Sequence, residues 1–306
     1  MIERTQAGLI PFPTQRLIAG DVLPCPLYID TAGTPRRWHE AGEPISRGAL
    51  AGLVDETVFI ENQALGGFAS FLMGRMERAL ERAHRDPLEC GRCAYDAGWA
   101  VLSDYFGRPE VTVARAKVAR LAALMATASA RAGALAAVIS AQAVAVPAIH
   151  GVRVAAMALA LGRARGLGDA SSRHLAEGAL LHDLGEAVMP PLTIESDTAP
   201  WAEAARAQHP SVGFGLLRAH GDLGPMLSGC VLAHHERLHG GGVPYGLSGD
   251  AVPLGGRVVG LVDAVDVHQA AHPALSLETG LSAVVAEEPG GFEPALIGAL
   301  ADACCS

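Results

Sequence analysis

The sequence predicts a mainly α-helical protein built from more than one unit. Half of its 306 residues are apolar but only 5% are aromatic, a balance that favours helices over sheets. After residue 64, apolar residues recur mostly at three- and four-residue steps, the period of one helix face. Short apolar runs broken by proline and glycine are confined to residues 16–60 and predict strands and turns. A chain of this length exceeds a usual single domain, and we expect two folded parts joined by a helical region.

Residues 1–62 are expected to form a small α+β module. Ser46, followed by Leu50 and Leu53, predicts one short helix that begins at a serine cap. The prolines and glycines around this helix predict the turns of the module. Its strands are expected at Val22-Leu23, Leu27-Tyr28-Ile29 and Val58-Phe59-Ile60.

Residues 63–146 are expected to form a helical linker region. A first helix starts near Leu65 and ends at Pro87, and a second runs from about Ala94 to Phe106. A long alanine-rich helix is expected from Val111 to about Val146, connecting the two halves. The apolar stretch from Ala132 to Ile149 is nearly long enough to span a bilayer, but alanine partitions weakly into lipid. We therefore expect a buried helix there.

Residues 147–306 are expected to form a helical domain. The segment from His239 to Gly246 is too rich in glycine for a helix or strand, so it predicts a loop beside whatever the helices enclose. The helices are expected at His150–Gly162, Ser171–Gly185, Ala202–Ala219, Pro225–Leu238 and Leu254–His268.

Charge and cysteine content restrict the partners. The net charge of −9, without a cluster of lysines or arginines, argues against duplex nucleic acid and anionic membranes as partners. The N-terminus lacks the pattern of a signal peptide, which favours a cytoplasmic protein. Six cysteines include the pair Cys90 and Cys93 without a second pair at zinc-ribbon spacing. We expect free thiols in a reducing cytoplasm. The oligomeric state stays open, with a dimer as one candidate.

Twelve histidines are unevenly distributed, with ten of them at or after His150. A lone histidine on an apolar helix is usually a hydrogen-bonded core residue. Here the doublets His182-Asp183 and His234-His235 each follow an apolar run, so several strongly hydrated groups would be buried together at high cost unless paired or bound to metal. Imidazole with carboxylate suits iron, manganese, zinc or nickel. A carboxylate that bridges two cations, with a hydroxide between them, is the chemistry of phosphate-ester hydrolysis.

At these positions the chain resembles the HD-GYP phosphodiesterases, a branch of the HD superfamily that hydrolyses the bacterial second messenger cyclic di-GMP. The resemblance covers roughly residues 150–299. The family's first histidine and its arginine-valine-alanine run are matched by His150 and Arg153-Val154-Ala155, and its HD doublet by His182-Asp183, 32 positions further on. The HPxxG, HHE and DxxD motifs are matched in family order by His209-Pro210-Ser211-Val212-Gly213, His234-His235-Glu236 and Asp263-Ala264-Val265-Asp266.

The resemblance implies an HD-type helical bundle with a binuclear metal site. Two divalent transition-metal ions are expected, iron or manganese with zinc or nickel as alternatives, and Asp183 would bridge them and act in catalysis with His182. Members with three metals carry a glutamate one turn before the first histidine, where this chain has Val146, so a third ion is not expected. The implied metal ligands are His150, His182, Asp183, His209, His234, His235 and Asp263.

The chain departs from the family around this site. Glu186 stands where the family keeps a phosphate-binding lysine, and the GYP loop has Val243 in place of tyrosine while Gly242 and Pro244 are kept. The basic run after the DxxD motif reads His272-Pro273-Ala274-Leu275. Candidate substrate contacts are therefore these loop residues, Glu186, and the cations Arg257, Arg153 and Arg237, with Arg257 first.

Three functions remain compatible with this pattern. The first is hydrolysis of cyclic di-GMP or a related cyclic dinucleotide through a metal-bridged hydroxide. The second is a signalling or scaffold protein of weak or no activity, which binds metal and engages a nucleotide or, through the loop from Gly240 to Tyr245, a protein partner. The third is an HD hydrolase of mononucleotides or other phosphate esters. The N-terminal module is similar to the small domain of some non-standard family members, but it carries no motif that shows what it senses.

Overall fold

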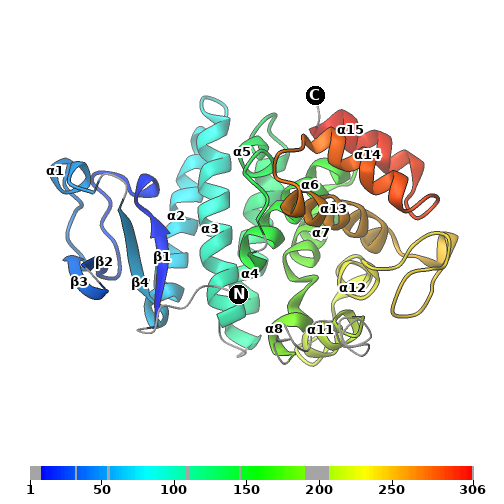
Figure 1. Ribbon diagram of the computed structural model, residues 1–306, viewed down its shortest axis with the longest axis horizontal. Coiled ribbons are helices and arrows are strands. Elements are labelled where there is room, and N and C mark those ends of the chain that lie inside the picture. Colours follow the sequence, from blue (N-terminus) through cyan, green and yellow to red (C-terminus); the bar gives the residue numbers. More distant parts are fainter. Residues whose placement is uncertain are drawn as a thin grey trace.

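The protein is described here from a computed structural model that covers residues 8–31, 33–53, 56–107, 111–144, 146–189 and 207–304. A small sheet lies at one end, two long helices follow it, and the C-terminal helices form the other end (Figure 1). One cluster of buried apolar side chains runs from Ile10 in the sheet to Leu300 near the C-terminus. The mainly α-helical prediction with a small N-terminal α+β part is confirmed.

The sheet has four antiparallel strands in the order β1-β4-β2-β3. Its buried face includes Phe12 and Val58, which are paired between β1 and β4. The short predicted helix is α1, Arg47–Ala51, and the Ser46 side chain accepts a hydrogen bond from the Ala49 amide at 3.0 Å, as its cap role requires. The strands are β1 (Leu9–Pro13), β2 (Leu27–Thr31), β3 (Thr34–His39) and β4 (Thr57–Glu61).

Two of the three predicted strands are confirmed, and the third is wrong. Val22 makes an isolated bridge to Pro44 and is not part of a strand. Strands β1 and β3 were not expected, since each contains proline. Both are edge strands of the sheet, where a missing backbone donor is tolerated.

Helices α2 (Leu65–Arg82) and α3 (Pro87–Gly107) pack against each other beside the sheet. The Phe12 ring of β1 meets the Phe68 ring of α2 edge to face, with centroids 5.1 Å apart. The prediction that Pro87 ends the first helix is wrong, because Pro87 begins α3. Proline fits the first turn of a helix, where its missing N–H would have no partner.

The prediction of a single long connecting helix is also wrong. Helix α4 (Val111–Ser129) is followed by turns and the short α5 (Ala136–Ile139), and residues 140–144 and 146 are not helical. Gly133 has a φ of +73°, a conformation that a helix cannot continue through. In its described residues, the stretch from Ala132 to Ile149 thus contains turns, the short α5, a non-helical connection and the start of α6 at Pro147. In the part of the chain that the structure describes, no helix is long and apolar enough to cross a membrane.

Each predicted C-terminal helix has a counterpart in the structure, but several of the bounds differ. The expected helix over 171–185 breaks at Asp183, whose φ of −93° and ψ of 12° separate α7 from α8. The first residues of the expected helix 202–219 lie outside the described residues, and two final helices were not expected. The helices are α6 (Pro147–Ala164), α7 (Asp169–Leu181), α8 (Leu184–Val188), α11 (His209–Arg218), α12 (Gly224–Ala233), α13 (Leu254–Ala271), α14 (Leu277–Glu287) and α15 (Pro294–Cys304).

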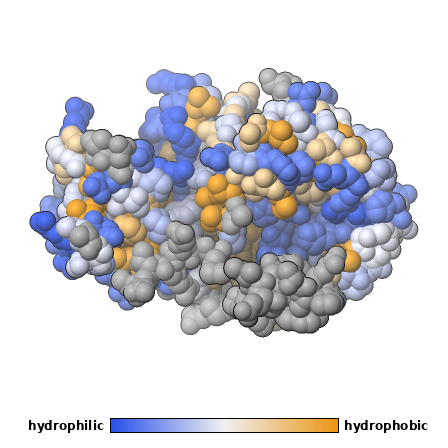
Figure 2. All heavy atoms as spheres, viewed as in Figure 1, coloured by the Kyte–Doolittle hydropathy of each residue, from blue (hydrophilic) through white to orange (hydrophobic). Residues whose placement is uncertain are grey.

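Helix α6 is the centre of the helical part. It packs against α3, α7, α13 and α15, and a helix enclosed in this way is apolar nearly all round. A Cβ at Gly98 of α3 would lie 2.3 Å from a methyl group of Val152 in α6, so these two helices approach closely. On the visible surface, apolar residues are scattered rather than gathered in one large patch (Figure 2). The division at residues 62 and 146 stays a prediction.

Candidate metal centre

All seven predicted metal ligands lie together, where the ends of several helices meet. His150 is in the first turn of α6, His182 and Asp183 join α7 to α8, and His209 begins α11. His234 and His235 directly follow α12, and Asp263 projects from α13. Most are buried: His182 is 1%, His209 2%, His234 0% and Asp263 4% exposed.

Asp183 lies between two clusters. Its Oδ2 atom is 3.1 Å from His182 Nε2 and 3.5 Å from His150 Nε2. Its Oδ1 atom is 3.3 Å from His209 Nε2 and 3.6 Å from His234 Nε2. The possible ligand atoms of Asp183, His150 and His182 all lie within 4.8 Å of one another. The same holds for Asp183, His209, His234 and His235, so each group could hold a metal ion. One carboxylate therefore serves both groups.

Asp263 extends the first of these groups. Its Oδ1 atom is 3.1 Å from His150 Nε2 and 3.7 Å from His182 Nε2. Its Oδ2 atom lies 3.9 Å from His235 Nδ1, on the side of the second group. The His150 group thus faces two carboxylates, whereas the His209 group faces chiefly the shared Asp183.

The imidazole nitrogens fit a cation better than they fit one another. Nδ1 of His182 lies 2.7 Å from the Ala179 carbonyl oxygen, and Nδ1 of His234 lies 3.0 Å from the Val231 oxygen, so both carry the proton there. Unless a second proton is bound, their Nε2 atoms present lone pairs, yet His182 and His150 Nε2 are 3.2 Å apart, and His234 and His209 Nε2 are 3.0 Å apart. Facing lone pairs repel unless a cation or proton lies between them. This donor set is compatible with divalent metal ions.

The electrostatics of the two groups differ. Burial opposes ionisation of Asp183 and Asp263, but the surrounding histidines hold the pKa of both carboxyls well below the usual value. Burial also opposes a charge on His182, yet Asp183 and Asp263 raise its pKa to about 10. In the other group burial dominates, lowering the pKa of His234 and bringing that of His235 to about 3. Those two imidazoles are held neutral, the form that binds metal.

Arg153 does not have the predicted place beside substrate. It is 1% exposed, and its Nε donates to Asp266 Oδ1 at 2.5 Å. The same guanidinium donates to the carbonyls of Ile139 and Ala141 and to the Gln269 side chain. Asp266 in turn binds His150 Nδ1 at 2.8 Å through its other oxygen. Arg153 therefore supports the centre through Asp266. Asp266 is the second aspartate of the DxxD motif, so the sequence contained a signal for this residue.

The predicted loop lies directly over the His234-His235 turn. The Glu236 carboxylate is 4% exposed and accepts hydrogen bonds from the Tyr245 and Leu247 amides, each at 2.8 Å. The Val243 amide donates to the His235 carbonyl at 3.1 Å. A Cβ at Gly242 would lie 2.4 Å from Glu236 Cα, so only glycine fits there. The expectation of a loop at this place is confirmed, whereas the role of Glu236 as its anchor was not foreseen.

The other predicted substrate contacts are distributed around the rim. Arg257 donates to the Val252 carbonyl at 2.6 Å and pairs with Glu293 at 3.2 Å, so its prediction as first choice of substrate contact finds no support. Arg237 pairs with Glu288 and lies over the Phe292 ring. Glu186 is 52% exposed on α8, with Oε1 3.8 Å from His209 Nδ1. Burial and the nearby Asp183 raise the pKa of Glu186.

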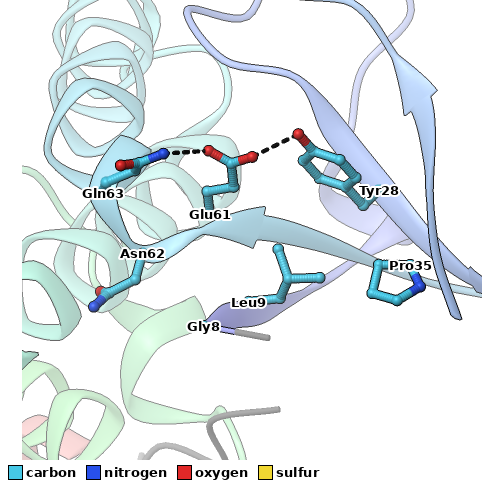
Figure 3. A pocket seen from close by; sticks show the side chains of 7 residues that line it. All are labelled: Gly8, Leu9, Tyr28, Pro35, Glu61, Asn62 and Gln63. Carbon is cyan, nitrogen blue, oxygen red and sulfur yellow. Dashed lines mark hydrogen bonds between the residues drawn. The ribbon is translucent and has the colours of Figure 1, made fainter. Parts of the chain in front are cut away.

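Two hollows lie in different parts of the molecule. One, of about 440 Å³, adjoins the centre and is lined by His235, Gly242, Val243 and Glu288 among others. The other, of about 560 Å³, lies at the sheet, where Tyr28 and Gln63 both donate to the Glu61 carboxylate, at 2.6 and 2.7 Å (Figure 3). In the sheet hollow Tyr28 and Gln63 thus satisfy the Glu61 carboxylate, whereas the lining of the first hollow includes a predicted metal ligand, His235.

A helical bundle whose helix ends bring histidines and aspartates together in this order defines an HD-type domain. The HD domain family model matches residues 120–283, more than half of the chain. The chain belongs to the HD domain family, and the resemblance to its HD-GYP branch is confirmed.

Two curated relatives and one solved structure show the extent of the similarity. The cyclic di-GMP phosphodiesterase response regulator RpfG of Xanthomonas campestris is 29% identical over 141 residues, which is 44% of this chain and 37% of that protein. A cyclic di-GMP phosphodiesterase of Pseudomonas aeruginosa is 29% identical over 151 residues, 48% of this chain and 36% of the relative. The chain thus spans well under half the length of these relatives. The solved structure of an HDG"Y"P protein from Bdellovibrio bacteriovorus, at 18% identity, covers 96% of this chain and 98% of its own with a TM-score of 0.72, which shows a shared fold.

Proposed function

We propose that this protein is a metal-dependent phosphodiesterase that hydrolyses cyclic di-GMP or a related cyclic dinucleotide. The observation that carries the proposal is the pair of histidine-aspartate groups that share Asp183. The Xanthomonas and Pseudomonas relatives are cyclic di-GMP phosphodiesterases, which supports the substrate class. The described cysteines Cys25, Cys90, Cys93 and Cys230 are free thiols, which supports action in the reducing cytoplasm.

Two divalent transition-metal ions fit the proposed centre. His150, His182, Asp183 and Asp263 would hold one ion, and Asp183, His209, His234 and His235 the other. Iron and manganese suit this mixture of imidazole and carboxylate, with zinc and nickel as alternatives. When bound, the ions would supply Lewis acidity toward the phosphate oxygens.

The side chains of the protein supply position and charge. The depressed pKa of Asp183 keeps this carboxylate anionic between the two groups, and His182 is held in place by the Ala179 carbonyl. Glu236 fixes the loop that carries Gly242, Val243 and Pro244 at the edge of the centre. We assign Asp183 and His182 to catalysis and the loop to the wall against which the substrate lies.

A second candidate function follows from the charge of the rim. Of the arginines predicted to bind phosphate, Arg153 is buried away from the rim, and Arg237 and Arg257 at the rim pair with carboxylates. Glu186 holds the place of the family lysine. An anion meets less attraction there than in a rim with free cations. This favours weak turnover, or binding of nucleotide or of a protein partner at the Gly240–Tyr245 loop without turnover.

One experiment separates these functions. Purified protein is analysed for metal and assayed with added manganese or iron(II) on cyclic di-GMP and on a generic aryl phosphodiester. We expect about two ions per chain and hydrolysis of both, and the double variant His234→Ala/His235→Ala should lose metal and activity. The matched control is His268→Ala/His272→Ala, a histidine pair of α13 and its C-terminal end with ring centroids 4.5 Å apart, which should keep both. Two ions without hydrolysis would favour the second candidate, and absence of metal would exclude both.

A further inference from the structure

The N-terminal sheet has a second face, which turns away from the helices. On the face toward the helices, Phe12 packs on rings of α2 and α3, and its strand partner Val58 is 0% exposed. Side chains alternate between the two faces along a strand, so the adjacent residues Pro11 and Phe59 belong to the opposite face. Both are partly exposed, and so is Tyr28 on β2. We call this opposite face the open face of the sheet.

One row of side chains crosses the open face. The register pairs Pro11 of β1 with Phe59 of β4, and Phe59 with Tyr28 of β2. It also pairs Tyr28 with Arg37 of β3, whose guanidinium lies 5.9 Å from the centre of the Tyr28 ring. Directly paired residues of antiparallel strands project to the same side. Two aromatic rings and a cation therefore lie side by side, and this is a combination on which nucleotide bases stack.

The sheet hollow of about 560 Å³ lies on the same open face. In Figure 3 the side chains of Leu9 and Pro35 lie on one side of the hydrogen-bonded line formed by Tyr28, Glu61 and Gln63. The hollow thus combines an apolar part with a polar edge. Its volume is within the range of small-molecule sites, roughly 300–1,000 Å³.

Glu61 supplies the negative charge of this polar edge. Tyr28 Oη donates to its Oε1 atom at 2.6 Å, and Gln63 Nε2 donates to its Oε2 atom at 2.7 Å. These hydrogen bonds, with that of Tyr28 as the larger cause, hold the pKa of Glu61 below its usual value. A carboxylate oxygen can accept two hydrogen bonds. Each oxygen has one such donor among the described residues, so the carboxylate is held in place and can still accept two more.

Guanine is the base whose edge fits such a carboxylate. Its Watson–Crick edge carries two adjacent donors, N1–H and the 2-amino group, which match the two oxygens. Adenine and cytosine have a ring nitrogen lone pair beside their amino group, and uracil has one donor between two carbonyls. Each of these three bases would therefore turn a lone pair toward the anion.

Arg37 adds a cation that could hold a phosphate. Its partner Glu40 lies 3.3 Å away, and the two side chains are 53% and 63% exposed. Exposed ion pairs of this kind are weak, so the guanidinium can exchange Glu40 for a phosphate, to which arginine binds well.

We propose that the open face of the sheet binds a guanine nucleotide. The base lies in the hollow with its two donors on Glu61, and the phosphate pairs with Arg37. The inference goes beyond the proposed function, because the sheet contains no predicted metal ligand and binding there requires neither metal nor hydrolysis.

The direct test is calorimetric titration of the whole purified chain with GMP and with AMP. A metal ion at the centre would hold the phosphates of both nucleotides alike, so a difference between them reports on the base. We expect GMP to bind roughly tenfold or more tightly than AMP, since hydrogen bonds to a charged group distinguish the two.

Glu61→Gln replaces one of the two acceptors by a donor. It should weaken GMP binding by roughly 10- to 100-fold and leave AMP binding within about twofold, so that the preference disappears. The matched control is Glu56→Gln, the same change at an exposed position just before β4 and outside the lining of the hollow, and it should keep the preference. Circular dichroism verifies that each variant is folded.

Arg37→Ala separates the phosphate from the base. It should weaken GMP binding by roughly fivefold, the scale of an exposed ion pair, and leave the binding of guanosine, which has no phosphate, within about twofold. Cyclic di-GMP, which carries the same base, is titrated beside GMP. The tighter of the two, in the binding that Glu61→Gln removes, identifies the source of the guanine.

Several results would overturn the inference. No binding of GMP, equal affinity for GMP and AMP, a preference that survives Glu61→Gln, or equal loss of GMP and guanosine binding in Arg37→Ala would each contradict it. None of these results bears on the proposed hydrolysis, which is measured at the metal centre with its own variants.

Discussion

Two parts of the candidate metal centre differ in charge. The floor consists of the seven candidate metal ligands, and the rim consists of Glu186, Arg237 and Arg257. On the floor, buried histidines surround Asp183 and Asp263 with the donor set of a cation site. At the rim, Glu186 is half-exposed, while Arg237 and Arg257 are paired with Glu288 and Glu293. This difference leads us to predict that metal binding and anion binding can be changed separately in this chain. Substitutions on the floor should change metal content, and those on the rim should change substrate affinity alone.

The largest effect is expected from Asp183→Ala on the floor. Because this carboxylate faces both groups, the variant should lose both ions rather than one. An ion bound to the native state alone stabilises it by about 2.7 kcal/mol at a hundredfold excess over Kd, so the Tm should fall by several degrees and become insensitive to chelator. Elemental analysis and thermal unfolding measure this.

The control for this substitution is Asp222→Ala, whose side chain is 89% exposed, and it should keep metal and Tm. Retention of one full equivalent of metal by Asp183→Ala would show that the two groups are independent.

A substitution between floor and rim sharpens the comparison. Gly242→Ala places a Cβ 2.4 Å from the Glu236 backbone, so the loop must shift, at about 1–3 kcal/mol as for other overpacked sites. Hydrolysis should fall while metal content stays near two ions, because the loop supplies no ligand.

Gly215→Ala in α11 is the matched control, since its Cβ would meet nothing within 4 Å. It should stabilise the helix by roughly 0.5–1 kcal/mol and keep full activity. If Gly242→Ala also loses metal, floor and rim cannot be treated separately.

The smallest effect is expected at the rim itself. Glu186→Lys removes a repulsion toward an anionic substrate and adds an attraction, and after desolvation and screening we expect about 1 kcal/mol, roughly fivefold in affinity. Calorimetric titration with cyclic di-GMP, at unchanged metal content, measures it.

Glu81→Lys in α2 makes the same change of net charge at an exposed position of a different part of the molecule, and it should leave binding unaltered. Weaker binding or lost metal in Glu186→Lys would mean that Glu186 supports His209 rather than opposing substrate.

The sequence indicated which side chains would lie together because four of them form the doublets His182-Asp183 and His234-His235. The family resemblance supplied His150, His209 and Asp263, and the assignment of all seven as metal ligands stays a prediction. The role of Arg153 could not be predicted, since its partner Asp266 is 113 positions away, and a lone arginine near a ligand motif is equally typical of a phosphate contact. Only packing of α6 on α13 brings the two together.

The errors in predicting the fold from the sequence have local causes. The alanine-rich run after Val111 has high helix propensity throughout, and its interruption depends on the backbone conformation at Gly133. Strands β1 and β3 were missed because proline argues against a strand unless the sheet order places it at an edge. Periodicity identified the long helices but not their ends.

The contact of the sheet with the helices has a consequence for how the protein unfolds. The Phe12 ring packs on Phe68 of α2 and, with centroids 5.4 Å apart, on Trp99 of α3. Removing residues 1–62 would therefore expose an apolar helix surface to water instead of freeing an independent unit. Melting should be cooperative, with the loss of the sheet and of the helices following a single calorimetric transition.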